Sequence, residues 1–195
     1  EILFIQGSII SAEHVQQGGE PLNLKEFVGS LDVPVIAGGV FDYSTATHLM
    51  RSGVAGVIVG SGHISTVVRV PTATAIADVA AARRDYLDET GGRYVHVLAD
   101  TAIYESGEIA AAIASGADAV MLGRNLAQAS EAAANGVYWE AQTAHPRFPR
   151  GDVSKDATTR RAVPLETVLF GPSSDPWGGL NVVGGLRRIM ADRKS

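Results

Sequence analysis

Two short apolar stretches, each ending in glycine, decide the fold class: Val35-Ile36-Ala37-Gly38-Gly39 and Ala55-Gly56-Val57-Ile58-Val59-Gly60-Ser61-Gly62. Nearly every residue in them is apolar, and polar residues do not alternate with apolar ones. This pattern is typical of parallel strands that are covered on both faces of a sheet. Amphipathic, helix-forming sequence follows the first stretch at once and the second after a short loop. The repeating unit is therefore a strand followed by a helix.

The same alternation extends in both directions along the chain. Strands are predicted at residues 2–6, 34–37, 55–59, 94–99 and 118–122, and helices at residues 24–31, 44–52, 74–89, 106–115 and 125–133. Asp42 or Ser44 is the expected N-cap of the second helix, because short polar side chains accept hydrogen bonds from free helix N–H groups. Gly53, Gly91 and Gly116 are the expected C-terminal glycines. These units indicate an α/β protein.

Two architectures are built from such units, an open doubly wound sheet and a closed (β/α)8 barrel of the TIM type. A dinucleotide-binding open sheet should carry G-x-G-x-x-G after an early strand, and only Gly60-Ser61-Gly62 is present. In a barrel the functional residues follow the carboxyl ends of many strands. Glycine follows four of the predicted strands and Asp100 follows the other. A barrel is therefore favoured over the open sheet.

The predicted strands are too few to close an eight-stranded barrel, and an incomplete row leaves unpaired edges. We expect either that N-terminal units are supplied by a further segment or that copies of the chain pair as a homo-oligomer. The alternative is that this stretch folds alone as an open sheet. Residues 1–135 are interpreted as the partial barrel. Residues 136–195, which hold most of the prolines, are interpreted as a flap-like loop over 136–180 and a C-terminal helix over 180–190 of the same domain.

Composition excludes several classes of function. The chain has 195 residues, 46% of them hydrophobic, and a net charge of −5 from 16 basic and 21 acidic residues. A net negative charge disfavours nucleic acid as a partner, and no apolar run is long enough to suggest a membrane span. With no cysteine, the chain has neither disulfides nor a thiolate nucleophile of its own.

The histidines lack metal-ligand spacing, so no metal site is expected. No signal-peptide pattern precedes the first strand, and a cytoplasmic location is expected.

Several strings, in order and spacing, resemble the second half of the IMP dehydrogenase / GMP reductase family. They are VIAGG (35–39), AGVIVGSG (55–62), TATAIADV (72–79), SGEI (106–109), GADAVMLG (116–123) and GGLRRIM (184–190). EPLNLK (20–25), RRDYLDE (83–89) and GGRY (91–94) resemble its IMP dehydrogenase-related branch, which lacks the regulatory insertion. The resemblance implies that the chain covers barrel strands four to eight. It also implies hydride transfer between a purine mononucleotide and NAD or NADP.

The resemblance implies a substrate site on the last two strand ends. Asp100 matches the aspartate that holds the ribose hydroxyls, with Thr101 beside it. Gly123 matches a glycine of the phosphate loop, and Arg124 follows it in place of the family's serine. An arginine can bind phosphate through two parallel hydrogen bonds. Thr101 and Ala102 stand where the family has two glycines.

The cofactor and catalytic positions implied by the resemblance lie on the earlier strand ends. Gly38 and Gly39 flank the cofactor, and Gly60 and Gly62 open the catalytic loop, where the nicotinamide and a monovalent cation bind. Ser65 takes the place of the family's cysteine nucleophile, with Thr66 next to it. The loop is shorter than in the family, and a serine hydroxyl without a neighbouring base is a poor nucleophile.

Three interpretations of function therefore stay open at this point. The first is an oxidoreductase of this family. The second is a divergent or engineered half-barrel that keeps the scaffold, and a phosphate site, without hydride transfer. The third is another phosphate-binding barrel enzyme, for which Asp100 would need an acid or base partner at a strand end. Each candidate site residue also has a purely structural interpretation. The glycines can be read as turn formers, Asp100 as an N-cap, Arg124 as a surface residue and Ser65 as an ordinary loop serine.

Overall fold

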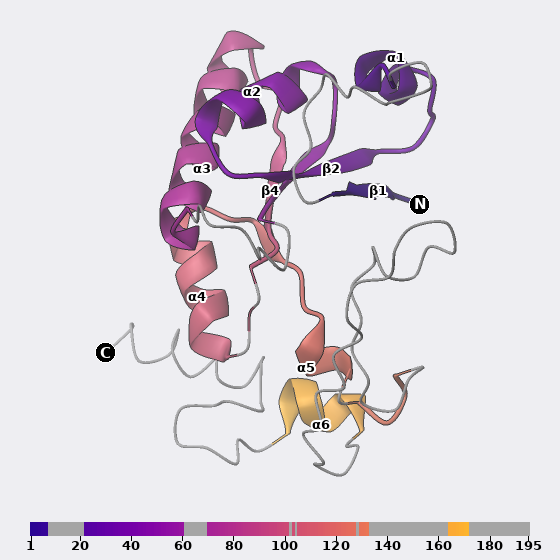
Figure 1. Cartoon of the computed structure of the whole chain (residues 1–195), viewed down its shortest axis with the longest axis vertical. Helices are drawn as coiled ribbons and strands as arrows, with labels where there is room; N and C mark the ends of the chain where they lie inside the picture. Colours follow the sequence, from indigo (N-terminus) through magenta and orange to yellow (C-terminus); the bar gives the residue numbers. More distant parts are fainter. Residues whose placement is uncertain are drawn as a thin grey trace. The chain divides into compact units, whose positions relative to one another are not determined.

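The computed structural model describes residues 1–7, 22–60, 70–101, 103, 105–127, 129–132 and 164–171 (Figure 1). The chain divides into two compact units. One unit comprises residues 1–101 and 112–121, and the other comprises residues 102–111 and 122–195. Within the described residues, no helix is both long and apolar enough to span a membrane.

The first unit is built on a parallel sheet whose strand order follows the chain, β1-β2-β3-β4-β5. Its strands are β1 (Leu3–Gln6), β2 (Val35–Val40), β3 (Gly56–Val59), β4 (His96–Ala99) and β5 (Ala119–Val120). A doubly wound sheet reverses its order at a switch point, and this sheet shows no reversal. The strand order is therefore that of a barrel, and it confirms the predicted α/β class.

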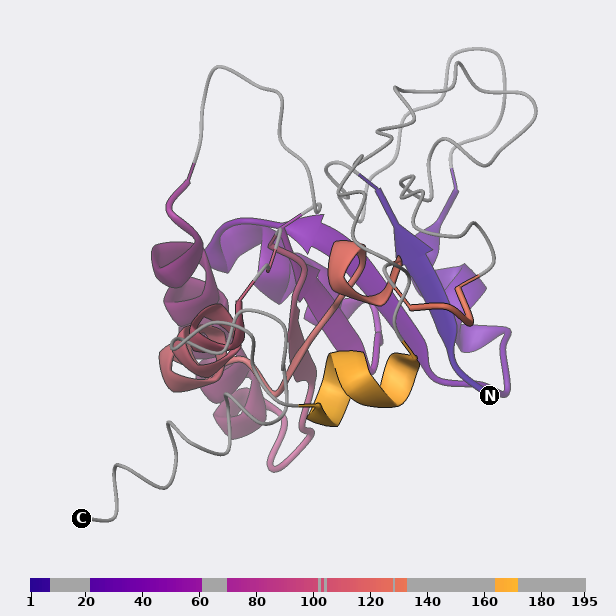
Figure 2. The ribbon, with the colours of Figure 1, turned by 90° about the horizontal axis from the view of Figure 1, so that it is seen from below.

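The helices of this unit pack on one face of the sheet (Figures 1 and 2). They are α1 (Leu24–Gly29), α2 (Tyr43–Arg51), α3 (Thr72–Glu89) and the second half of α4 (Ser106–Ser115). One buried cluster joins Leu24, Met50, Ile76 and Ala112 from these helices to strand residues such as Val57. Helices on a single face are the arrangement of a barrel wall, because a doubly wound sheet carries them on both faces.

The opposite face of the sheet carries a second, smaller apolar cluster. Ile36, Ile58 and Leu98 are buried there, and Met121 packs against them. These side chains come from adjacent strands and alternate with the residues that face the helices. This inner face leads toward the carboxyl ends of the strands, where the site residues lie.

The predicted boundaries hold closely for the helices of the first unit and less well for the strands. Asp42 is the N-cap of α2, because its carboxylate accepts from the N–H of Thr45 at 2.9 Å, whereas Ser44 lies inside the helix. The C-terminal glycines Gly53, Gly91 and Gly116 all have positive φ, at 98°, 69° and 118°. Strand β2 extends to Val40, so the glycines predicted to follow it lie within it.

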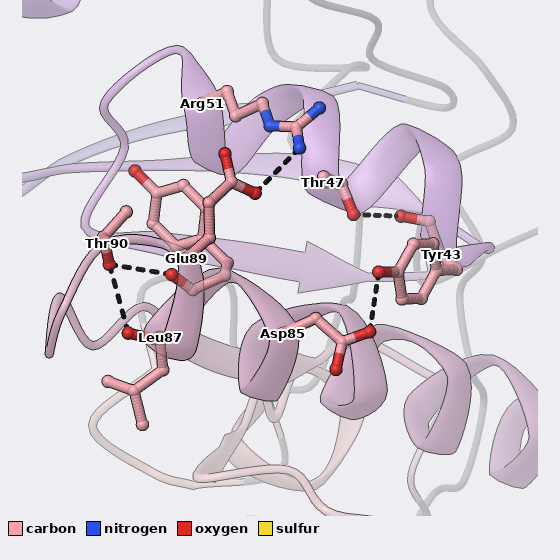
Figure 3. A network of polar contacts seen from close by, with 8 residues as sticks. Tyr43, Thr47, Arg51, Asp85, Leu87, Glu89 and Thr90 are labelled. Carbon is pink, nitrogen blue, oxygen red and sulfur yellow. Dashed lines mark hydrogen bonds and ion pairs between the residues drawn. The ribbon is translucent and has the colours of Figure 1, made fainter.

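Helices α2 and α3 are joined on their outer surface by side-chain hydrogen bonds (Figure 3). The Tyr43 hydroxyl donates to Asp85 at 2.7 Å, and Arg51 pairs with Glu89 at 2.7 Å. The hydrogen bond to Asp85 is the largest reason that the pKa of Tyr43 lies above its usual value. Arg51 and Glu89 are exposed, so buried residues such as Leu49 supply most of the packing energy.

The described residues of the second unit include the first half of α4 and two short helices, α5 (Arg124–Ala127) and α6 (Leu165–Phe170). Helix α5 is shorter than the predicted helix over 125–133, and α6 falls inside the segment predicted to be a loop. The carboxylate of Glu131 accepts the N–H of Leu165 at 2.9 Å. This hydrogen bond is the largest cause that lowers the pKa of Glu131. A long-range cap of this kind explains why α6 had no local N-terminal signal. The predicted helix over 180–190 lies outside the described residues.

Candidate functional site

The carboxyl ends of the first four strands are joined by backbone hydrogen bonds beyond the regular ladder. The N–H of Gly7 donates to the carbonyl of Gly38 at 2.7 Å, and the N–H of Gly39 donates back to Gly7 at 3.0 Å. The N–H of Gly60 donates to Val40 at 3.0 Å, and the N–H of Asp100 donates to Val59 at 2.8 Å. The strand ends thus form one continuous rim, which we call the mouth (residues 6–7, 38–40, 59–60 and 99–101).

The glycines of the mouth are required by close contact between neighbouring strands. A Cβ added to Gly39 would lie 2.8 Å from the carbonyl carbon of Gly60, and one added to Gly38 would lie 2.8 Å from the Cα of Ile58. Gly60 has φ +93° and faces the carbonyl of Asp100. Packing alone is therefore sufficient to require glycine at these three positions. Their predicted contact with a cofactor stays a prediction.

Strand β2 is irregular where it reaches the mouth. Its register against β3 shifts between Gly38 and Val40, so Gly39 has no partner of its own on β3. The peptide bond between Gly38 and Gly39 is cis. Register shifts of the kind seen between Gly38 and Val40 are frequent next to functional sites, because they redirect a strand end.

Asp100 lies at the mouth at the end of β4, and its carboxylate accepts a hydrogen bond from the side-chain amide of Gln6 on β1. Two strands, β2 and β3, lie between them. In a flat sheet, with neighbouring strands about 4.8 Å apart, β1 and β4 would be separated by about 14 Å. That separation exceeds the reach of these two side chains. The contact therefore requires a strongly curled sheet, as in the wall of a barrel.

The alternative role for the Asp100 carboxylate was to cap the next helix, and that helix has a cap within its own first turn. Helix α4 begins at Ser106, and the carboxylate of Glu108 accepts the N–H of Glu105 at 3.0 Å in its first turn. The N–H of Glu108 in turn donates to the carbonyl of Glu105 at 3.1 Å. This reciprocal pair caps the start of the helix.

The remaining predicted substrate residues are only partly placed. Thr101 is half-buried at the mouth, with its methyl group 3.2 Å from a Cβ built on Gly60. Gly123 belongs to the second unit, where its carbonyl accepts from the N–H groups of Leu126 and Ala127 at 3.1 and 3.0 Å. Arg124 is the first residue of α5. Gly62, Ser65 and Thr66 lie outside the described residues.

Sequence reasoning missed Gln6, the partner of Asp100. It was assigned to a strand and given no role, because a glutamine at a strand end carries no motif. Its position at a carboxyl end, next to Gly7, was the available signal, since functional side chains of barrels gather there.

A second polar cluster lies at the opposite, amino end of β4 and β5. Asp118 accepts from the Tyr94 hydroxyl at 2.6 Å, from Arg83 at 2.7 Å and from the N–H of Val97 at 2.8 Å. Burial by itself would raise the pKa of Asp118, but these hydrogen bonds and the Arg83 charge outweigh it and lower the pKa. The bond to Asp118 is the main cause of a raised pKa at Tyr94. This cluster joins α3 to two strand starts, so its role is structural.

Metal ligands do not gather in the part of the chain that the structure describes. No group of three or more histidine, aspartate or glutamate side chains is arranged there to hold a metal ion. The described part of the mouth therefore contributes a carboxylate, an amide and closely packed backbone, a set suited to binding hydroxyl groups by hydrogen bonds.

Comparison with known proteins decides the family. The model of the IMP dehydrogenase / GMP reductase domain matches residues 9–168. The chain belongs to this family. A solved structure of an IMP dehydrogenase/GMP reductase-like protein from Corynebacterium glutamicum superposes with a TM-score of 0.84 at 59% sequence identity, over 97% of this chain and 50% of that chain.

Curated relatives of this IMP dehydrogenase / GMP reductase family member agree with that assignment. An uncharacterized oxidoreductase of Mycobacterium tuberculosis is 61% identical over 98% of this chain and 53% of its own length. An inosine-5'-monophosphate dehydrogenase of Thermoplasma acidophilum is 36% identical over 63% of this chain and 25% of its own length. The chain thus spans about half the length of its more similar relatives. Its fold is the (β/α)8 barrel type, of which the described sheet supplies five strands.

Proposed function

We propose that this chain is part of an oxidoreductase that binds a purine mononucleotide, with the ribose hydroxyls on the Asp100 carboxylate. The observation that carries the proposal is the contact between Asp100 and Gln6 at the mouth. It holds a half-buried carboxylate at a strand end where barrel enzymes bind their substrates. An ionised carboxylate accepts hydrogen bonds at both oxygens, so it can accept two neighbouring hydroxyls of a ribose.

The phosphate of the nucleotide is proposed to lie on the loop that follows β5. Gly123 belongs to this loop, shortly after β5, and Arg124 follows it as the first residue of α5. Barrels commonly bind phosphate on the last two such loops. The guanidinium of Arg124 supplies a permanent positive charge with paired N–H donors, which match phosphate oxygens.

The redox partner is proposed to be NAD or NADP, as in the family, and when bound it would accept or supply a hydride. Gly38, Gly39 and Gly60 are the described residues assigned to it. The N–H groups of Gly39 and Gly60 are already engaged within the sheet. These glycines would therefore border the cofactor with a surface free of side chains, not donate hydrogen bonds from these two N–H groups. The monovalent cation is proposed for the loop over residues 60–62.

A second candidate function is nucleotide binding without hydride transfer. The observation that favours it is the absence of cysteine from the chain, since the family's thiolate attacks the purine. Ser65 in that position has a hydroxyl that is almost wholly protonated at neutral pH. The two candidates share the nucleotide site and differ only in turnover.

A thermal-shift titration tests the binding that both candidates share. The titration uses IMP, GMP and XMP, with inorganic phosphate and ribose 5-phosphate as controls. A ligand that binds the native state raises stability by RT ln(1 + [L]/Kd), so a purine mononucleotide should raise the melting temperature more than either control. Equal shifts with nucleotides and controls would contradict the proposal.

Turnover separates the two candidates. We would assay nucleotide-dependent NAD reduction by the full chain, and by a variant carrying Ser65→Cys, Thr101→Gly and Ala102→Gly. Reduction by the unsubstituted chain supports the oxidoreductase. Reduction by the variant alone supports a nucleotide-binding protein that has lost only the residues which contact the substrate.

A further inference from the structure

Gln6 and Asp100 meet because the two strands between them carry glycine at the mouth. Gln6 is in register with Gly38 on β2, and Gly60, directly after β3, faces the backbone of Asp100. Side chains at Gly38 and Gly60 would clash with neighbouring backbone in this arrangement. The glycines therefore allow the curled sheet to bring a β1 side chain to a β4 carboxylate.

The hydrogen bond joins one exposed side chain and one half-buried side chain. Ordering a glutamine side chain costs conformational entropy. An amide suits this contact, because it donates an N–H to the carboxylate without adding charge. Among the described residues, its second N–H and its carbonyl make no further hydrogen bond. A carboxylate at position 6 would instead place like charges in contact.

We propose that Gln6 is a positioning residue, which holds the Asp100 carboxylate in the orientation that accepts the ribose hydroxyls of a bound mononucleotide. This inference rests on the proposed function. A side chain that is already oriented before binding loses little conformational freedom when the ligand binds. Orienting Asp100 in advance therefore increases the affinity for the ligand. The gain is specific to ligands whose hydroxyls reach Asp100.

The test compares ligands that differ only at the ribose hydroxyls. Affinities for IMP and 2',3'-dideoxy-IMP, which lacks both ribose hydroxyls, are measured by calorimetry with the full chain and with Gln6→Met, which keeps the length of the side chain but removes its donors. We expect Gln6→Met to weaken IMP binding about two- to tenfold, because an unpositioned carboxylate must be ordered when the ligand binds, and to leave 2',3'-dideoxy-IMP nearly unchanged. Gln6→Glu should weaken IMP binding further, because it repels Asp100.

Two controls keep the test specific. Glu26→Gln changes an exposed side chain in α1 and should alter neither affinity. Melting temperatures of all variants show whether the fold is retained. As a test without nucleotide, the side-chain amide signal of Gln6 in NMR spectra should move as Asp100 is titrated, and this movement should disappear in Asp100→Asn.

The outcomes separate this inference from the proposed function. If the unsubstituted chain binds neither nucleotide, the proposed function fails and the inference fails with it. If the unsubstituted chain prefers IMP but Gln6→Met weakens both nucleotides equally, the proposed function stands and the positioning role is overturned. The positioning role would also be overturned if the amide signal of Gln6 did not move during the titration of Asp100.

Discussion

At the scale of single residues, two observations explain why position 60 requires glycine. Its φ of +93° is unfavourable for other residues, and a Cβ would meet the carbonyl of Asp100. Gly91 also has positive φ, +69°, but nothing lies within 4 Å of a Cβ added there. We expect Gly91→Ala to cost about 1–2 kcal/mol from φ alone, and Gly60→Ala to cost clearly more. Urea unfolding of both variants checks this, and equal losses would contradict the clash.

The pKa of Asp118 predicts how acid affects stability. Its pKa is lower in the folded chain, so the hydrogen-bonded carboxylate contributes stability above its unfolded pKa, and this contribution is lost as pH falls through the folded value. We expect Asp118→Asn to cost about 1.5–3 kcal/mol at neutral pH, because its hydrogen bonds involve a charge.

The measurement for Asp118 is chemical unfolding of both proteins between neutral pH and about pH 3. The stability difference should shrink once the pH falls below the ordinary aspartate pKa of about 3.9. Asp88→Asn serves as a control at an exposed aspartate of α3 and should show no comparable difference. A difference for Asp118→Asn that stays constant across this range would rule out the ionised carboxylate as its cause.

The strand ends show why residue-level prediction was incomplete. Asp100 and the glycines of the mouth could be found from sequence, because each lies directly after a predicted strand or close to its end. The pairing of Asp100 with Gln6 could not be found, since it depends on the curl of the sheet across two intervening strands. The hydrogen bonds of Asp118 likewise join residues far apart in sequence.

At the scale of elements, α2 allows the stability contributed by a buried residue to be compared with that of an exposed ion pair in the same helix. Leu49 is fully buried, whereas Arg51 pairs with Glu89 in an exposed position. We expect Leu49→Ala to cost about 2–5 kcal/mol through the lost contacts and the cavity. Arg51→Ala should change stability by little more than experimental error, because exposed ion pairs contribute weakly. Thermal unfolding compares them, and a large loss for Arg51→Ala would contradict this account.

Helix prediction succeeded where a local signal exists and failed where the signal is distant. The prediction for α4 matched its observed bounds, and α2 and α3 begin within two residues of their predictions, since caps and apolar spacing lie within each segment. Helix α6 was missed because its first N–H is capped by Glu131, far earlier in the chain. The strands were predicted too long at their starts, because apolar residues continue into the loops before them.

At the scale of the whole molecule, the first strand exposes apolar surface. Ile2 is 56% exposed and Phe4 is 47% exposed, and within the described residues β1 pairs with β2 alone. Exposed apolar edge strands favour association. We therefore expect the isolated chain to associate as its concentration rises, and Phe4→Lys to weaken this association. Sedimentation velocity over a range of concentrations measures it, and an isolated chain that stays monomeric throughout would contradict the expectation.

The central claim is that a purine mononucleotide binds at the mouth through Asp100. The most direct measurement is calorimetric titration of IMP into the full chain and into Asp100→Asn. We predict that IMP binds the unsubstituted chain and that the substitution weakens binding about tenfold or more, because hydrogen bonds to a charged group are lost. Absence of binding, or equal affinity for the two proteins, would contradict the claim.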